Sequence, residues 1–140
     1  MNYEELQQHI RHLESFEAAD TPIVNCYLGL ESFYRETLNE QSRAITAGMP
    51  LEMRASFWEI LGYIEVFLGT NIMPGSKGIA CFARWGDLSF FLPLQFAVTF
   101  PNSIVLRPMP QIHPLIQQRD AMVCLVANPD GRAIVNAQRC

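Results

Sequence analysis

Apolar side chains recur at helical spacing in three parts of the chain. The strongest pattern runs from Pro50 to about Leu68, where apolar positions three or four residues apart share one side of a helix. These positions are Met53, Phe57, Ile60, Leu61, Ile64, Phe67 and Leu68. The same spacing predicts a helix over residues 3–17, along Tyr3, Leu6, Ile10, Leu13 and Phe16.

A further helix is expected between these two. Its inner side would carry Tyr34, Leu38 and Ile45. Ser32 is the expected N-cap, because a hydroxyl at that position can accept a hydrogen bond from the first turn. Gly48 is expected in the left-handed conformation that often follows a helix.

Two apolar runs, Gly78–Phe82 and Leu88–Leu92, predict a β-hairpin around the turn Arg84-Trp85-Gly86-Asp87. Both runs are almost continuously apolar, so both faces of the hairpin should be covered. The pattern therefore places this hairpin in the middle of a sheet.

Shorter patterns complete the first 119 residues. Ile23–Leu30 predicts a buried strand, and Ile104–Leu106 a short one. Alternation of Phe96, Val98 and Phe100 with polar or small residues predicts an edge strand or a bend. The prolines that follow leave room for a short helix near Ile112–Gln118. Residues 1–119 are therefore predicted to form one α+β domain, a mixed sheet packed by helices, in which a β-α-α-β-β-β series follows an N-terminal helix.

A last hairpin is predicted from Ala121–Ala127 and Arg132–Ala137, joined by the turn Asn128-Pro129-Asp130-Gly131. We interpret residues 120–140 as the opening of a second domain. An isolated two-stranded hairpin is marginal in water. It is expected to dock on the first domain or to pair with a second copy of the chain, which would make a homodimer.

Composition narrows the class of protein. The chain has 140 residues, of which 49% are hydrophobic and 17% charged, which is typical of a folded domain rather than a disordered segment. No apolar run is long enough to span a membrane. The first residues lack the basic and apolar regions of a secretory signal, so a cytoplasmic location is expected.

Charge and cysteine usage argue against several kinds of site. The net charge is −4, so the chain lacks the broad positive field of non-specific nucleic-acid binders, and no DNA binding is expected. The four cysteines are far apart in sequence and are expected to act as small apolar side chains rather than as metal or redox groups. His9 and His12 lie three residues apart, near Glu5, but surface histidines are favoured over a zinc site because no third ligand is fixed.

No catalytic constellation is apparent. Ser76-Lys77-Gly78 resembles part of a phosphate-binding loop, but the residue order differs from GxxxxGK[ST], and a turn entering a strand is favoured. The acidic residues outside the helices are scattered, and nothing pairs two of them as acid and base. The chain is therefore expected to be no enzyme and to hold no cofactor and no metal.

The order of elements and three motifs resemble the N-terminal domain of archaeo-eukaryotic class 1 peptide-chain release factors, and more closely their bacterial relatives. The motifs are PIVNCYLGL at 22–30, KGIACFA at 77–83 and VLRPMP at 105–110. The final AMVCLVANPDGRAIV, residues 121–135, is similar to the first hairpin of that family's second domain. The resemblance covers essentially the whole chain and implies a scaffold shaped for the decoding region of the ribosome.

The departures from that family concern its active motifs. The chain has no Gly-Gly-Gln, the triplet that positions water at the peptidyl-tRNA ester. Where the family reads stop codons with Asn-Ile-Lys-Ser, between the two long helices, residues 41–50 are QSRAITAGMP. The resemblance therefore implies a binding module without hydrolytic or codon-reading motifs.

Three residues are candidates for contact with a partner. Arg43 and Arg54 flank the loop between the long helices, at the end that faces the messenger in the family, so they are candidate RNA contacts; solvated helix arginines, neutralised by nearby glutamates, are the alternative. Most aromatic residues, Trp58 among them, are expected in the core by their spacing, whereas Trp85, in the predicted hairpin turn, is a candidate for an exposed interaction surface. The leading hypothesis is a translation-related module that associates with the ribosome or RNA. The alternative is a regulatory or structural protein–protein module that has lost RNA contact.

Overall fold

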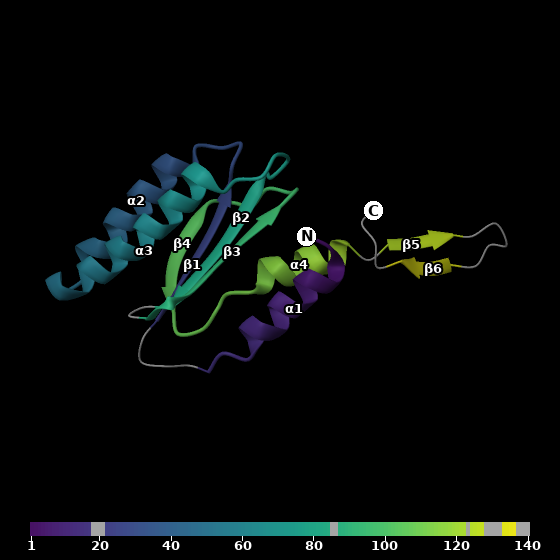
Figure 1. The fold of residues 1–140 in the computed structure, drawn as a ribbon, viewed down its shortest axis with the longest axis horizontal. Coiled ribbons are helices and arrows are strands. Elements are labelled where there is room, and N and C mark those ends of the chain that lie inside the picture. The colour runs from purple at the N-terminus through teal and green to yellow at the C-terminus, as the bar shows by residue number, and fades with distance from the viewer. Residues whose placement is uncertain (18–21, 85–86, 123, 128–132, 137–140) are drawn as a thin grey trace. The chain divides into compact units, whose positions relative to one another are not determined.

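The structure is a computed structural model that describes the chain apart from residues 18–21, 85–86, 123, 128–132 and 137–140. The contacts divide the chain into two compact units, Ala18–Pro110 and the combination of Met1–Glu17 with Gln111–Cys140. Figure 1 labels the helices and strands of both units. None of the described helices has the length and apolar character needed to cross a membrane.

The larger unit contains a four-stranded sheet in the order β3-β2-β1-β4. Its strands are β1 (Ile23–Gly29), β2 (Gly78–Arg84), β3 (Asp87–Phe96) and β4 (Ser103–Arg107). Every neighbouring pair is antiparallel, so the expectation of a mixed sheet is wrong. Two helices join β1 to β2, and the second returns the chain to the end at which β1 finished; β2 therefore runs antiparallel to β1.

The predicted hairpin is formed by β2 and β3, but only β2 lies inside the sheet. The first six residues of β2 are buried, as its continuous apolar run predicts. β3 is the edge strand, and Phe90–Pro93 are only half-buried. The apolar run therefore predicted the burial of β2 correctly. The second strand, β3, has a strand neighbour on one side only and is less buried than its apolar run predicted.

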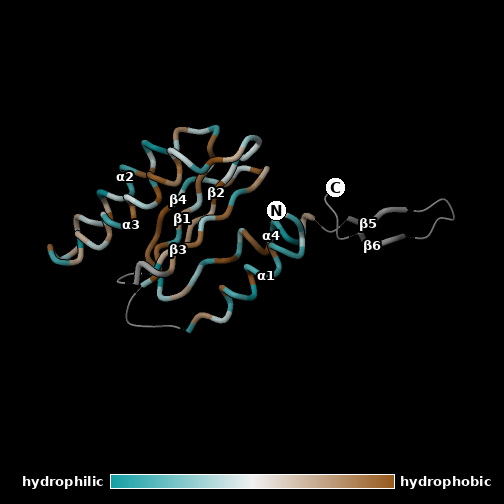
Figure 2. The backbone as a smooth tube through the Cα atoms, viewed as in Figure 1, coloured by the Kyte–Doolittle hydropathy of each residue, from teal (hydrophilic) through white to brown (hydrophobic). Residues whose placement is uncertain are grey.

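Helices α2 (Tyr34–Ala47) and α3 (Leu51–Thr70) cover one face of the sheet (Figure 1). The helix predicted from Pro50 is confirmed as α3, with Pro50 as its N-cap residue. Figure 2 shows that hydrophobic residues are concentrated in the strands. Successive side chains of a strand point to opposite faces of the sheet, so alternate ones face the helices. The core between the helices and the sheet consists of Val24, Cys26, Leu28, Leu38, Met49, Phe57, Ile60, Leu61, Ile64, Leu68, Ile79, Cys81, Ala83 and Ile104.

The ends of α2 differ from those expected. The N-cap residue is Phe33, not Ser32, and it makes no capping hydrogen bond through its side chain. The Ser32 hydroxyl instead donates to the Gly29 carbonyl oxygen at 2.7 Å and accepts from the Asn102 amide at 2.8 Å, which ties the loop after β1 to the loop before β4. Gly48 follows α2 with φ −94°, so the expected left-handed conformation is wrong. Among the described residues only Gly75 has positive φ, at 85°.

The chain bends after β3 instead of continuing as an edge strand, because two glycines leave room for it. Gly29 and Gly78 are opposite each other in the β1–β2 ladder. A Cβ on Gly29 would lie 2.7 Å from the Phe100 carbonyl oxygen, and one on Gly78 would collide with the Val98 carbonyl oxygen. The bend lets the ring of Phe100 pack edge-on against Tyr27, with ring centres 5.3 Å apart.

The smaller unit contains α1 (Tyr3–Glu14), α4 (His113–Ala121), β5 (Cys124–Ala127) and β6 (Ala133–Asn136). Asn2 caps α1 by accepting from the Glu5 backbone N–H at 2.8 Å. Arg119 of α4 donates to the side-chain oxygen of Gln7 at 2.9 Å, which joins the two helices. β5 and β6 form the expected antiparallel hairpin, but Ala121 belongs to α4 and not to its first strand. The turn between these strands lies outside the described residues.

Candidate nucleic-acid interface

The junction of α2 and α3 holds both arginines that the sequence proposes as RNA contacts. Arg43 lies in the last turns of α2, and Arg54 in the first turn of α3. The structure therefore places the two on either side of one short connection, residues 48–50. Trp85, the third candidate, lies outside the described residues.

A chain of hydrogen bonds runs through this junction. The Thr46 hydroxyl donates to the Ser42 carbonyl at 2.9 Å and to the Arg43 carbonyl at 3.2 Å. The Met49 N–H donates to the Thr46 carbonyl at 3.1 Å, and Arg54 Nε donates to the Met49 carbonyl at 3.1 Å. The Thr46 carbonyl is one of the groups that the end of a helix leaves open. The bonds to the Thr46 and Met49 carbonyls connect the end of α2 to the start of α3.

The two arginines differ in how accessible they are. Arg43 is exposed, whereas Arg54 is half-buried and already uses Nε in the junction. A phosphate group can therefore approach all of the Arg43 guanidinium, but only the terminal amino groups of Arg54. Arg43 is the better candidate for a direct contact.

Acidic side chains lie on the same helices and reduce the positive potential. Glu40 is one turn before Arg43, and Glu52 is in the first turn of α3; both are exposed. No ion pair between either arginine and a carboxylate is found among the described residues. The junction therefore carries two arginines without a direct ion pair among the described residues, within a mixed-charge surface, which suits a local contact with phosphate rather than broad electrostatic attraction.

Arg35, also on α2, contacts an aromatic ring and does not lie at the junction. Its guanidinium carbon lies 5.5 Å from the centre of the Tyr34 ring, a cation–π distance. It is in the first turn of α2, so it is at the opposite end of the helix from the junction.

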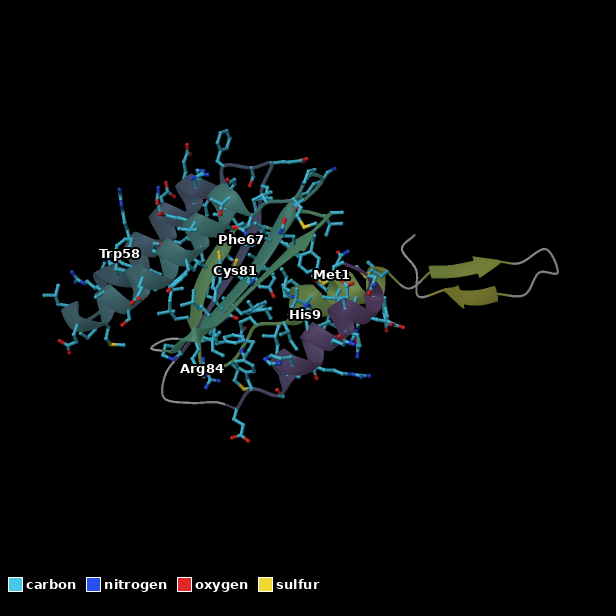
Figure 3. The ribbon with its side chains drawn as sticks, viewed as in Figure 1. Met1, His9, Trp58, Phe67, Cys81 and Arg84 are labelled. Carbon is cyan, nitrogen blue, oxygen red and sulfur yellow. The ribbon has the colours of Figure 1, made fainter. Side chains whose placement is uncertain are left out.

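The sequence interpretation missed an apolar surface on the far side of α3. Trp58 was expected in the core, but 49% of its surface is exposed. Phe67, on the same helix, packs against the core instead; both residues are labelled in Figure 3. Leu51 and Val66 share the exposed side of the helix with Trp58, with exposed fractions of 76% and 64%. The signal was present in the sequence as a second set of apolar positions, offset from the core positions.

The described cysteines and histidines provide no evident reactive centre. Cys26 and Cys81 are free, buried and opposite each other in the β1–β2 ladder. Burial raises the pKa of Cys26 to about 12. Burial also raises the pKa of Cys81, and the neighbouring Cys26 raises it further. Both are therefore protonated near neutral pH, and a thiol is a poor nucleophile.

Desolvation lowers the pKa of His9, an effect that the Glu5 carboxylate opposes. No group of three or more metal-binding side chains occurs among the described residues.

Comparison with known proteins assigns no family to this chain. No protein-family model and no curated protein sequence matches it. The resemblance to class 1 release factors therefore depends on its motifs and order of elements.

Proposed function

We propose that this chain is a translation-related binding module that associates with the ribosome through RNA, similar in role to the recognition domain of a release factor. The observation that carries the proposal is that exposed Arg43 and half-buried Arg54 lie on either side of one short connection, at the junction of two long helices. In the family that the sequence resembles, this end of the domain faces the messenger.

The chemistry of the junction supports contact with RNA. Arginine binds phosphate through a planar fork of donors and also stacks on unpaired bases. The first N–H groups of α3 add partial positive charge beside Arg54. The junction offers only two arginines, and the net charge of the chain is −4, so its affinity for RNA should be weak and its contact local. Other contacts with the ribosome would supply the rest of the binding free energy.

The proposed role is binding and not catalysis. The chain has no Gly-Gly-Gln, and residues 41–50 contain no Asn-Ile-Lys-Ser. The two described thiols, Cys26 and Cys81, are buried and protonated. A module of this kind would occupy or sense the decoding region without releasing peptide.

Co-sedimentation of the full chain with ribosomes over a salt series tests the proposal. Arg43→Ala is expected to weaken binding and to lower the salt slope by about 0.7, the loss of one contact with single-stranded phosphate. Arg11→Ala is the matched control, because Arg11 is an exposed helix arginine on α1 and changes the net charge equally. The proposal is wrong if the wild-type chain sediments no more than an unrelated acidic protein, or if both variants weaken binding alike.

A protein–protein module, regulatory or structural, is the second candidate. The exposed side chains of Leu51, Trp58 and Val66 on α3 favour it, since exposed apolar residues gathered on one surface often form an interface. The homodimer through the β5–β6 hairpin that the sequence suggested also belongs to this candidate, because strand edges are a template for pairing.

A further inference from the structure

The side of α3 that faces away from the sheet carries a continuous line of apolar and small residues. The line follows one side of the helix because its members are three or four residues apart. We call it the outer stripe, and its members are Leu51, Ala55, Trp58, Gly62, Val66 and Gly69. All of them are exposed except Gly62, which is half-buried.

Helix α3 carries apolar residues on two opposite sides. The inner side of α3 is filled by Phe57, Ile60, Ile64 and their neighbours, which pack on the sheet. The outer stripe is apolar as well, whereas a surface helix typically buries one apolar side and keeps the opposite side polar. The charged residues of α3, such as Glu59 and Glu65, lie on the flanks between these two apolar sides. The three large members of the stripe, Leu51, Trp58 and Val66, are therefore exposed where a surface helix would carry polar side chains.

The two glycines of the stripe are not required by the fold of the chain itself. A Cβ on Gly62 or on Gly69 would meet nothing within 4 Å, and neither residue has positive φ. Glycine lowers helix stability relative to alanine, so these positions disfavour the helix without an evident gain within the chain. Because they carry no side chain, they leave two gaps between the larger side chains of the outer stripe, which we call hollows.

The stripe is complementary to itself when its direction is reversed. If a second α3 lies antiparallel with the two-fold axis near residue 60, Leu51 faces Gly69, and Trp58 faces Gly62. Ala55 faces Val66 in the same register. Each large side chain then meets a small residue, which is the pattern that allows two helices to approach closely and interdigitate.

The charged residues beside the stripe fit the same register. Arg54 and Glu65 are eleven residues apart, about three helical turns, and so lie on one flank of the stripe. Arg54 is six residues before position 60 and Glu65 five residues after it, so reversal brings them level to within about 1.5 Å, the rise of one residue. The two-fold axis would create this pair twice.

We propose that α3 binds α3 of a second copy of this chain, antiparallel along the outer stripe, with Arg54 of each copy paired with Glu65 of the other. A second copy is the partner that fits, because α3 alone supplies both the large side chains and the hollows, and both the positive and the negative charge. When a second α3 runs in the opposite direction, each of these groups faces its complement. Such a surface makes an isologous interface, in which the same patch is used by both partners. The inference goes beyond the proposed function and does not depend on it.

Sedimentation equilibrium of the full chain over a concentration series is the first test. The wild-type chain is expected to form dimers. Gly62→Gln fills the hollow opposite Trp58 with a good helix former, and is expected to raise the dissociation constant at least about tenfold with unchanged helical content. Met73→Gln is the matched control, because Met73 is exposed outside α3 and its replacement should leave the dissociation constant unchanged.

Charge variants test the register. Glu65→Arg places like charges opposite each other twice and is expected to weaken the dimer about tenfold. Combining it with Arg54→Glu restores opposite charges and should recover the affinity. Glu59 lies one residue from the axis, so its two copies approach each other; Glu59→Gln should lower the dissociation constant about twofold. Recovery and tightening are results that damage to the monomer cannot produce.

The outcomes separate this inference from the alternatives. A chain that stays monomeric at about 0.1 mM overturns it. So does a dimer that is indifferent to Gly62→Gln and Glu65→Arg, since that dimer would use another surface such as the β5–β6 hairpin. Ribosome binding is measured separately through Arg43, which is outside the stripe, so the failure of one proposal leaves the other testable.

Discussion

At the level of single residues, two buried thiols and one buried phenol make the stability of the fold depend on pH. Burial raises the pKa values of Cys26, Cys81 and Tyr27 above their ordinary values of 9.0 for the thiols and 10.0 for the phenol. In the unfolded chain these groups lose their protons at lower pH than in the folded chain. Their contribution to stability is therefore complete below pH 9 and is lost as the pH rises further.

We expect the free energy of unfolding to be nearly constant from pH 7 to about pH 8.5 and to fall above pH 9. Each group that is protonated only in the folded state adds a slope of about 1.4 kcal/mol per pH unit. For Cys26, whose pKa is about 12, the fall continues to that pH. Urea unfolding at a series of pH values measures it. Cys26→Ala should reduce the slope, and a wild-type slope of zero between pH 9 and 10 would contradict the argument.

Two glycines at the end of the central strands are sensitive positions. Gly78→Ala is expected to lower the free energy of unfolding by about 1–3 kcal/mol, the usual cost of overfilling a packed site, because its Cβ would collide with the Val98 carbonyl oxygen. Gly48→Ala is the control, since a Cβ there meets nothing within 4 Å. Equal effects of the two replacements in chemical denaturation would show that the close approach at Gly78 is not tight.

At the level of elements, hydrophobic spacing predicted best where a segment is long. The twenty residues of α3 repeat their apolar positions often enough to specify the helix and its inner side. The position of β3 at the edge was not predictable from its own residues. Pairing in a sheet is decided by distant segments, here by β4 joining β1 rather than β3. Trp58 shows a second limit: spacing identified the inner side of α3, but it does not show whether an apolar residue on another side of the helix is covered or exposed.

Gln95 shows how one polar side chain positions a whole connection. Its Oε1 accepts from the Met73 N–H at 2.8 Å and from the Ser76 hydroxyl at 2.7 Å, and its Nε2 donates to the Asn71 carbonyl at 3.0 Å. Three hydrogen bonds from β3 therefore hold the segment that leads from α3 to β2. Nothing in the sequence distinguished Gln95 from other polar residues, because its partners lie about twenty positions away.

Gln95→Ala is expected to lower the free energy of unfolding by about 1–3 kcal/mol, since it leaves a backbone N–H and a carbonyl without their partner. Limited proteolysis should also become faster between Asn71 and Ser76. Gln8→Ala, an exposed glutamine of α1, is the matched control and should change neither measurement. Unchanged proteolysis in Gln95→Ala would mean that the connection is held by other contacts.

At the level of the whole molecule, the order of segments along the chain does not reveal which of them associate. Gln7 and Arg119, 112 positions apart, join α1 to α4 in one unit, while the sheet and its helices form the other. Amphipathic spacing predicted that α1 has an apolar side, but not the helix beside it. The candidate RNA residues were found at one junction because α2 and α3 are consecutive, which is information that the sequence does contain.

The two proposed surfaces share Arg54, and this has a consequence for their behaviour together. In the dimer Arg54 would pair with Glu65 of the second copy, and in the ribosome complex its terminal amino groups would face phosphate. Binding of RNA and self-association should therefore oppose each other, and by linkage each weakens the other by the same factor.

We expect the apparent affinity of the wild-type chain for ribosomes to fall as the chain concentration rises into the dimer range. Gly62→Gln, which retains both arginines but disfavours the dimer, should bind with an affinity that does not depend on its concentration, and at high concentration more tightly than wild type. Co-sedimentation at two chain concentrations measures this directly. If wild type and Gly62→Gln bind alike at both concentrations while only wild type dimerises, the two surfaces are independent and Arg54 serves at most one of them.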